Sequence, residues 1–361
     1  METLTQQLET MYQVSVGLIS TLQNIFPGGE EFFVGVSKFA DPKYVFTVHF
    51  PILFSLHWVI GVQLLGTVIV AEWSNQILKW LMKGERPYWW VHETKSYNAT
   101  LPPEIIQFSS TCETGPGTPS GHSMVMSAVW YVIVNSVIQK VVRQSNRLTS
   151  FQKDFVSNSL WTIYGMFMML VALSRMYIAA HFLHQCVLGV ALGIIVARTV
   201  CGSSKWINMS RSSWYGASAI VLFSALSTYV CLLAVGGDPA WSIRRAVRWC
   251  AKREYIHVDT TPFYSLARYS GATLGLGLGV TSSAMKKIDR SKFNMKATIG
   301  LIFLCFLAGK MTEVAHVLIP KEIDIVFYTL EFLLNAALPY VVISSVPYFI
   351  HLGVANKSKR S

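Results

Sequence analysis

Charge is scarce in this chain, because only 14% of its 361 residues are Asp, Glu, Lys or Arg, against about 25% in an average soluble domain. Its six cysteines show no paired spacing, which argues against a disulfide scaffold and a zinc site. A basic segment followed by an apolar one is missing from the first residues, so no cleavable signal peptide is expected. The scarcity of charge, with an apolar composition, disfavours a soluble enzyme, a disordered protein and a nucleic-acid-binding protein.

Hydrophobic residues make up 52% of the chain and fall in long blocks. A transmembrane helix needs about 20 mostly apolar residues. Nine segments are candidates, namely 30–50, 57–78, 120–139, 155–173, 179–199, 214–235, 263–283, 296–317 and 325–349. Segment 30–50 is the weakest, because charged residues and a proline interrupt it at positions 38–43, so eight spans remain the alternative. The sequence predicts an all-α, polytopic membrane helix bundle of about nine transmembrane helices, forming a single domain over 1–361.

Lys and Arg in short loops indicate the orientation, because such loops stay in the cytosol. With nine spans, the basic loops after the third, fifth and seventh spans and the basic tail 351–361 all share one side. The segment 1–28 has no Lys or Arg and is therefore expected on the lumenal side. Its residues 3–25 have the spacing of a helix that lies on the membrane surface. Loop 236–262 breaks the rule with five basic residues, which a structured, folded-back loop would explain.

Short motifs add to this topology. Of three glycosylation sequons, at Asn98, Asn208 and Asn356, only Asn98 falls on the lumenal side, so only Asn98 is expected to carry a glycan. The C-terminus has Lys359 and Lys357 three and five places from its end, respectively. That spacing matches the dilysine retrieval signal of endoplasmic reticulum membrane proteins, although a solvated basic tail is the alternative.

Three polar clusters stand out against the apolar spans. They are Lys79 with Arg86-Pro87, then Pro119-Ser120-Gly121-His122, and then Ser174-Arg175 with His181. They lie at four helix ends that face the same side of the membrane in either orientation. Bundling the helices would therefore bring two Arg, one Lys and two His together.

Such a set suits phosphoryl transfer. Two guanidiniums and an ammonium supply donors for phosphoryl oxygens, and two imidazoles supply a nucleophile and a proton donor. We expect Thr118 to cap the third span with Pro119 at its first helical position, so that the N–H groups of Ser120 and Gly121 point at an anion. Taken singly, each cation is explained as an interface anchor and each His as a structural residue. The occurrence of all three clusters together favours a phosphoryl-transfer site over separate structural roles.

At these residues the chain resembles the type-2 phosphatidic acid phosphatase and vanadium haloperoxidase superfamily, whose tripartite signature the three clusters match. Longer stretches resemble the glucose-6-phosphatase catalytic subunit family. They are Arg86-Pro-Tyr-Trp-Trp-Val91, Cys112-Glu-Thr-Gly-Pro-Gly-Thr-Pro-Ser-Gly-His122, His181-Phe-Leu-His-Gln185 and Ile256-His-Val-Asp-Thr-Thr-Pro-Phe263. The similarity runs from about Asp41 to the C-terminal tail.

The resemblance implies an endoplasmic reticulum enzyme with a phosphatidic acid phosphatase-type core and a lumenal active site. It implies hydrolysis of glucose 6-phosphate through a phosphohistidine, the last step of gluconeogenesis and glycogenolysis, without metal or other cofactor. The functional partner it implies is a glucose-6-phosphate translocase. Carried onto this chain, it makes His181 the nucleophile and His122 the proton donor. The phosphate-binding residues would be Lys79, Arg86, Arg175, Ser120 and Gly121.

The match has two departures. In the wider superfamily an Asp follows the nucleophilic His by four residues, but this chain has Gln185, so another group must fix the His181 tautomer. Leu183 stands where Pro is usual.

Sugar recognition is harder to read from the sequence. Glu113, Asp41 and Asp259 are candidate sugar-binding carboxylates, although surface or structural roles are the plainer explanation. Trp89 and Trp90 could stack on a sugar ring or mark the membrane interface. His184, one helical turn from His181, is a candidate supporting residue.

Two rival functions stay open, a lipid phosphate phosphatase with the same chemistry and a low-activity or non-catalytic paralogue. An active enzyme needs His181 neutral and His122 protonated, which predicts a bell-shaped rate profile. The sequence does not settle whether Cys112 and Cys250 pair.

Overall fold

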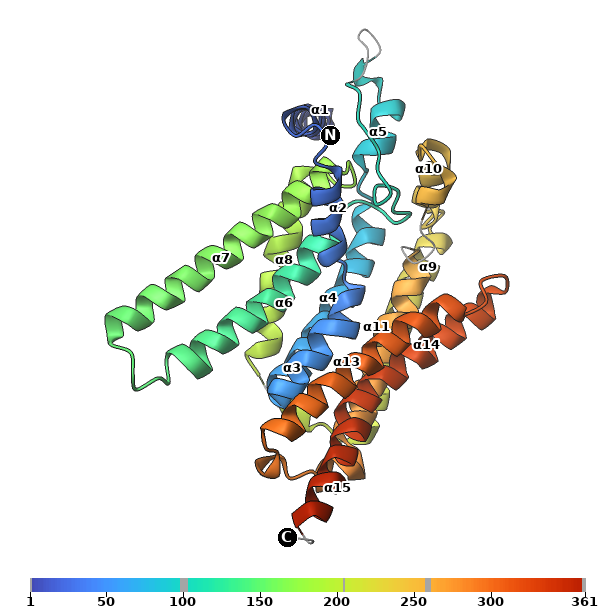
Figure 1. The fold of residues 1–361 in the computed structure, drawn as a ribbon. Helices are drawn as coiled ribbons and strands as arrows, with labels where there is room; N and C mark the ends of the chain where they lie inside the picture. The colour runs from blue at the N-terminus through green and yellow to red at the C-terminus, as the bar shows by residue number, and fades with distance from the viewer. Residues whose placement is uncertain (1, 98–102, 204, 257–260, 359–361) are drawn as a thin grey trace.

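The structure is a computed structural model that describes residues 2–97, 103–203, 205–256 and 261–358. Its described residues are mainly helical and contain no β-strand. The helices form one elongated bundle, with the two chain ends at opposite ends of it (Figure 1). The all-α prediction is confirmed.

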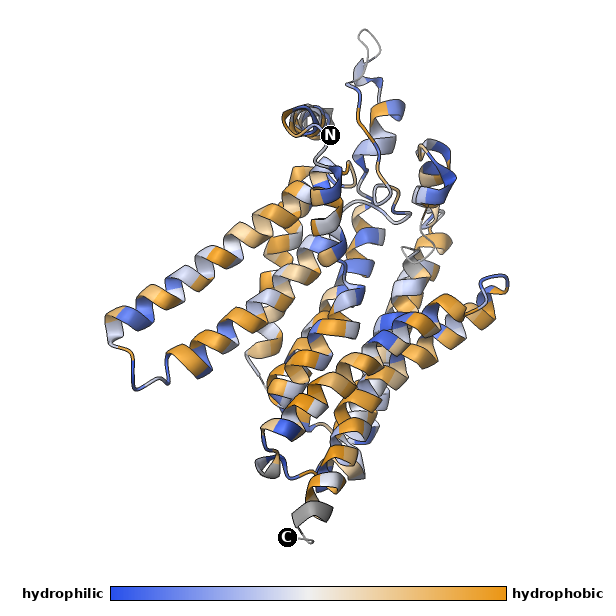
Figure 2. Cartoon of the chain, in the orientation of Figure 1, coloured by the Kyte–Doolittle hydropathy of each residue, from blue (hydrophilic) through white to orange (hydrophobic). Residues whose placement is uncertain are grey.

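Six helical segments of the described chain are long and apolar enough to cross a membrane. Apolar residues dominate them, and polar residues gather toward the ends of the bundle (Figure 2). The segments are α6 (Gly121–Val137) with η3 (Ile138–Val142), α7 (Ser150–Tyr177), α8 (Leu183–Cys201), α9 (Arg211–Ala234), α13 (Met295–Leu318), and α14 (Asp324–Tyr340) with η8 (Val341–Ser345) and α15 (Val346–Ser358). The chain is therefore a multi-pass membrane protein. Most of the expected tail 351–361 is helical, because α15 extends to Ser358.

Helices α4 (Trp58–Met82) and α11 (Pro262–Val280) run along the same bundle but are not among these six segments. The expected first span 30–50 has different boundaries. It divides into α2 (Glu30–Phe39), η1 (Val45–His49) and α3 (Phe50–Leu56). Pro42 lacks a backbone donor, and the carboxylate of Asp41 accepts the N–H of Lys43 at 2.9 Å, which interrupts the helix. The count of nine spans stays a prediction.

Close contact between α6 and α8 fixes the geometry on which the site rests. A Cβ added to Gly193 would lie 2.2 Å from the carbonyl oxygen of Met124, and one added to Gly189 would lie 2.7 Å from that of Ser120. Glycine at both positions lets the two backbones approach, as small residues do in membrane helix pairs. The start of α6 therefore lies directly against the first turns of α8.

The bundle end that holds the chain's N-terminus is covered by helix α1 and by several short elements (Figure 1). They are α1 (Glu2–Ile25), α5 (Pro87–Glu93), η2 (Lys95–Tyr97), α10 (Trp241–Trp249) and η5 (Arg253–Tyr255). Helix α1 lies across this end, and its Tyr12 stacks on Phe182 with ring centroids 4.6 Å apart. The opposite end carries η4 (Lys205–Asn208), α12 (Ser283–Lys287) and η7 (Arg290–Lys292).

Loop 236–262 folds back onto α5, as its unexpected positive charge suggests. Arg245 on α10 forms ion pairs with Glu85, at 2.5 Å, and with Glu93, at 2.8 Å. These pairs neutralise part of the positive charge of the loop. That charge is unexpected on the lumenal side, where the sequence analysis places the loop.

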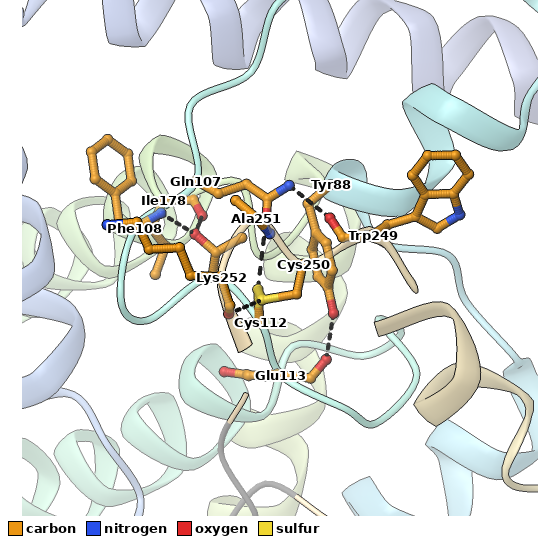
Figure 3. Close-up of a disulfide and its surroundings, with 11 residues drawn as sticks. Tyr88, Gln107, Phe108, Cys112, Glu113, Ile178, Trp249, Cys250, Ala251 and Lys252 are labelled. Atoms are coloured by element: carbon orange, nitrogen blue, oxygen red, sulfur yellow. Dashed lines mark hydrogen bonds between the residues drawn. A yellow bond between two sulfur atoms is a disulfide. The ribbon is translucent and has the colours of Figure 1, made fainter. Parts of the chain in front are cut away.

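A disulfide bond joins Cys112 to Cys250 across 138 residues of chain (Figure 3). Beside it, the side chain of Gln107 bonds to the carbonyl of Trp249 at 3.0 Å and to the N–H of Ala251 at 2.9 Å. The pairing that the sequence leaves open is thus made, and it ties the loop before α6 to α10.

We predict that Cys250→Ser lowers the free energy of unfolding by about 2–4 kcal/mol, because the bond closes a long loop in the unfolded chain. The midpoint of thermal unfolding in detergent measures the change. Cys231→Ser, at an exposed free cysteine, is the control and should leave the midpoint unchanged. Equal midpoints for all three proteins would refute a structural role for the bond.

Candidate active site

The three polar clusters meet at the bundle end covered by α1, α5 and α10. Lys79 lies in the last turn of α4 and Arg175 in the last turn of α7. Arg86 precedes α5, Ser120 precedes α6, and His181 lies in the connection between α7 and α8. The convergence expected from helix topology is therefore observed.

The start of α6 differs from the expectation. The helix begins at Gly121, with Ser120 and not Thr118 as its capping residue, and Pro119 follows Thr118 through a cis peptide bond outside the helix. The N–H of Ser120 donates to the carbonyl of Gln185 at 3.1 Å. Because that donor is already used within the protein, of the two expected backbone donors only that of Gly121 remains a candidate for an anion.

Arg86 is fully buried and is held by backbone carbonyls. Its guanidinium donates to Gly115 at 2.7 Å, to Pro116 at 3.2 Å and to Ala180 at 3.0 Å. These bonds fix its orientation and connect the loop before α6 to the α7–α8 connection. Arg175, also buried, donates to the hydroxyl of Ser37 at 2.5 Å. Both cations are thus pre-positioned side chains, not mobile surface groups.

One carboxylate, that of Glu113, lies among all these groups. Its oxygens bind Arg86 at 2.9 Å and Arg175, and they lie 3.5 Å from Nδ1 of His122 and 3.6 Å from Nε2 of His181. Burial alone would raise the pKa of Glu113, but Arg175 and Arg86 hold it well below its usual range. A charged anion therefore occupies the point where the cations and imidazoles converge.

The tautomer of His181 follows from its neighbours. Its Nδ1 lies 2.9 Å from the carbonyl of Gly117 and 3.1 Å from Oε1 of Gln185. The Gln185 amide is oriented by its own bonds, since Nε2 donates to the carbonyl of Glu85 and Oε1 accepts the N–H of Phe182. Both partners of Nδ1 are acceptors, so Nδ1 carries the proton and Nε2 keeps its lone pair. Gln185 and Gly117 thus perform the orientation that an Asp provides in the wider superfamily.

The protonation state of His181 suits a nucleophile. Burial and the positive charge of Arg86 lower its pKa from 6.5 to about 3. The imidazole is therefore neutral at ordinary pH. Its Nε2, which lies 3.2 Å from Arg86, faces the convergence point.

Gly117 must be glycine for the loop to reach His181. A Cβ at this position would lie 2.2 Å from the carbonyl oxygen of Glu85 and 2.8 Å from Nε2 of Gln185. The close approach that glycine allows puts the Gly117 carbonyl within bonding distance of Nδ1.

A cavity of about 100 Å³ opens beside Glu113 and His122, and Lys79, Gly121 and the expected Asp41 also line it. Its remaining polar lining residues, which the sequence analysis missed, are Glu72, Asn75, Gln76, Lys43, Ser265 and Arg268. The sequence carries a signal for the first three, because positions 72, 75, 76 and 79 share one face of α4. Polar residues at that spacing in an otherwise apolar helix indicate a cavity.

The buried polar groups of this cavity are only partly paired. Arg268 donates to Glu72 through two bonds, at 2.7 and 3.0 Å. Nε2 of Gln76, by contrast, is buried and has no partner among the described residues. An unpaired buried amide is costly unless a ligand or water satisfies it.

Some expected residues lie elsewhere. His184 does not line the cavity and packs on Phe182 and Tyr12 in an aromatic cluster. Trp89 and Trp90 are buried in that part of the protein and do not line the cavity. Asp259 and Asn98 lie outside the described residues.

Comparison with known proteins defines the class of this fold and site. Residues 60–208 match the PAP2 superfamily, a stretch that includes all three clusters, so the protein is a PAP2-type phosphatase, a phosphoric monoester hydrolase. No solved structure matches significantly.

Relatives specify the family. The chain is 32% identical to human glucose-6-phosphatase 2, with 98% of this chain and 100% of the relative aligned. It is 34% identical to rat glucose-6-phosphatase catalytic subunit 1, with 99% of each chain aligned. For the bovine catalytic subunit 1 the identity is 35%, over 94% of this chain and 96% of the relative. The chain belongs to the glucose-6-phosphatase family.

We predict that Gln185→Leu lowers kcat about 100-fold, the cost of misplacing a reacting group, and changes KM little, because Arg86 and Arg175 keep their positions. Hydrolysis of p-nitrophenyl phosphate measures both constants. Val187→Ala, at an exposed position of the same helix, serves as the control. An unchanged kcat in the Gln185 variant would show that the amide does not orient His181.

Proposed function

We propose that this protein hydrolyses glucose 6-phosphate to glucose and inorganic phosphate through a phosphohistidine at His181. The observation that carries the proposal is the position of the Glu113 carboxylate, bound by Arg86 and Arg175 and within 3.6 Å of both imidazoles. Carboxylate and phosphate oxygens bind the same guanidinium donors. The carboxylate therefore marks where a phosphoryl group would sit.

In the first step, Nε2 of His181 attacks phosphorus and the bond from phosphorus to O6 of the sugar breaks. The proton that O6 needs comes from His122, which acts as the general acid. Arg86 and Arg175 stabilise the charge on the transferring oxygens, and Lys79 and Gly121 line the adjoining cavity. Phosphohistidine and glucose result.

In the second step, water attacks phosphorus and the bond from phosphorus to Nε2 breaks. The now neutral His122 accepts the proton of that water, which restores both imidazoles. The carbonyl of Gly117 and Oε1 of Gln185 hold Nδ1–H through both steps. No group besides the chain and water is needed to balance the reaction.

The cavity lining favours a sugar phosphate over a lipid phosphate. Carboxylates, amides and a guanidinium face the space beside the phosphate position, from Asp41, Glu72, Asn75, Gln76 and Arg268. Such groups bind hydroxyls, whereas acyl chains would leave the buried amide of Gln76 without a partner. We infer that the sugar ring lies in this cavity and that Asp41 and, once displaced, Glu113 contact it.

We further propose that the site opens to the lumen of the endoplasmic reticulum, with the N-terminus lumenal and the C-terminus cytosolic. The Cys112–Cys250 disulfide near the site supports this, because disulfides persist in oxidising compartments. The basic loops support it through the positive-inside rule, and we expect a glycan at Asn98.

Glucose 6-phosphate is charged and is made in the cytosol, so a lumenal site needs a carrier. We propose a glucose-6-phosphate translocase as the functional partner and the final step of gluconeogenesis and glycogenolysis as the role. The apolar surface of the helices would lie in membrane lipid.

We predict that the wild-type protein releases phosphate from glucose 6-phosphate much faster than from phosphatidic acid in detergent-opened microsomes. His181→Ala should abolish the release, because the covalent step has no nucleophile. His92→Ala is the matched control, because that imidazole is exposed and stacks on Trp249. Turnover of the lipid alone would overturn the substrate assignment, and full activity of the His181 variant would overturn the mechanism.

The pH profile gives a separate test. His181 acts when neutral, so activity is lost only as pH falls through its folded pKa of about 3. With a pKa of 6.5, the neutral fraction would fall about thirtyfold between pH 8 and pH 5. We predict that kcat/KM, expressed for dianionic substrate, shows no such fall, so that the acid limb of the expected bell-shaped profile is missing. An acid limb near pH 6.5 that Gln185→Leu shifts would contradict this.

A further inference from the structure

The carboxylate of Glu113 holds the groups that the proposed reaction requires. Both guanidiniums that would bind phosphate bind this carboxylate instead. Nε2 of His181, the proposed attacking atom, lies 3.6 Å from one of its oxygens, and Nδ1 of His122 lies 3.5 Å from the other. A phosphoryl group cannot reach these donors while the carboxylate remains among them.

The backbone of Glu113 is fixed, so only its side chain is free to leave. Its carbonyl accepts the hydroxyl of Tyr88 at 2.9 Å, and its N–H donates to the carbonyl of Thr111, also at 2.9 Å (Figure 3). The preceding residue, Cys112, is tied to Cys250. A Glu side chain has three rotatable bonds and can turn without backbone movement.

The cavity beside the carboxylate gives it a place to turn to. Glu113 itself lines this cavity, together with Lys79. The ammonium of Lys79 offers a displaced carboxylate a new charge partner, so displacement need not leave a buried charge alone.

Two anions cannot share the arginine pair. A phosphate dianion and a carboxylate within a few ångströms of each other would repel strongly in a buried site. The carboxylate stays charged, because Arg175 and Arg86 hold the pKa of Glu113 well below its usual range despite burial. It therefore competes with phosphate at every pH at which the enzyme works.

We propose that Glu113 is an internal ligand of the phosphate site, which the phosphate monoester displaces on binding and which returns to expel inorganic phosphate. The inference rests on the proposed function and adds the regulation of that site. The carboxylate of Glu113 would then have two effects. It would lower the affinity of the enzyme for free phosphate, and it would speed the release of inorganic phosphate after hydrolysis. The apparent affinity for any anion equals the intrinsic affinity multiplied by the fraction of enzyme in which the carboxylate has turned away.

The test is the inhibition of hydrolysis by inorganic phosphate, and its binding to the detergent-solubilised enzyme followed by thermal shift. Glu113→Gln keeps the shape of the side chain and removes its charge. We expect it to tighten phosphate binding about tenfold. This is the effect expected if the Glu113 carboxylate has turned away from the arginines in about one tenth of the wild-type enzyme. Glu93→Gln removes a carboxylate on the same end of the bundle that binds Arg245 instead, and it should leave phosphate affinity unchanged.

Unchanged or weaker phosphate binding in Glu113→Gln would overturn the inference, because a carboxylate that merely positions the arginines would help phosphate to bind. If Glu113→Gln does not fold, Glu113→Asp replaces it. The shorter carboxylate reaches the arginines less well, so phosphate should again bind more tightly than in the wild type, and weaker binding would overturn the inference. If the wild-type protein does not hydrolyse glucose 6-phosphate, that separate result would refute the proposed function.

Discussion

Two guanidinium groups, those of Arg86 and Arg175, are buried at one end of the helix bundle, and both bind a single carboxylate. Cations in such a place are costly unless an anion compensates them. The protein supplies Glu113 for that purpose, and the proposed reaction supplies a phosphoryl group. The same electrostatic requirement thus explains why Glu113 lies between the two arginines and why we propose that the site binds a phosphate monoester.

The surroundings of the arginines serve to hold that geometry. Carbonyls of the 115–117 loop and of Ala180 orient Arg86, while the glycine contacts between α6 and α8 bring Gln185 against Ser120. The disulfide secures the loop next to Glu113. Charges that are held rigidly do not have to reorganise during the reaction. Such preorganised charges lower the activation free energy by stabilising the transition state.

The sequence predicts the meeting of the three clusters, because polar residues at helix ends on one side must come together in any bundle. It also indicates the folded-back loop through its misplaced positive charge. It does not predict that Glu113 lies between the arginines or that Gln185 orients His181, since both depend on loop conformations without periodic patterns. The expected cap at Thr118 was wrong because α6 begins only at Gly121, after Pro119 and Ser120. The sequence analysis missed the polar face of α4 because its few polar residues lie within an otherwise apolar segment.

The central claim, that His181 takes the phosphoryl group held by the arginines, is tested most directly by trapping the intermediate. Enzyme mixed with glucose 6-phosphate labelled on phosphorus and quenched in alkali should carry label that is stable to base, labile to acid, and located on the peptide containing His181. Label on that peptide in the wild type and none in His181→Ala is the predicted result. Rapid hydrolysis without any labelled protein, or label on another residue, would contradict the account.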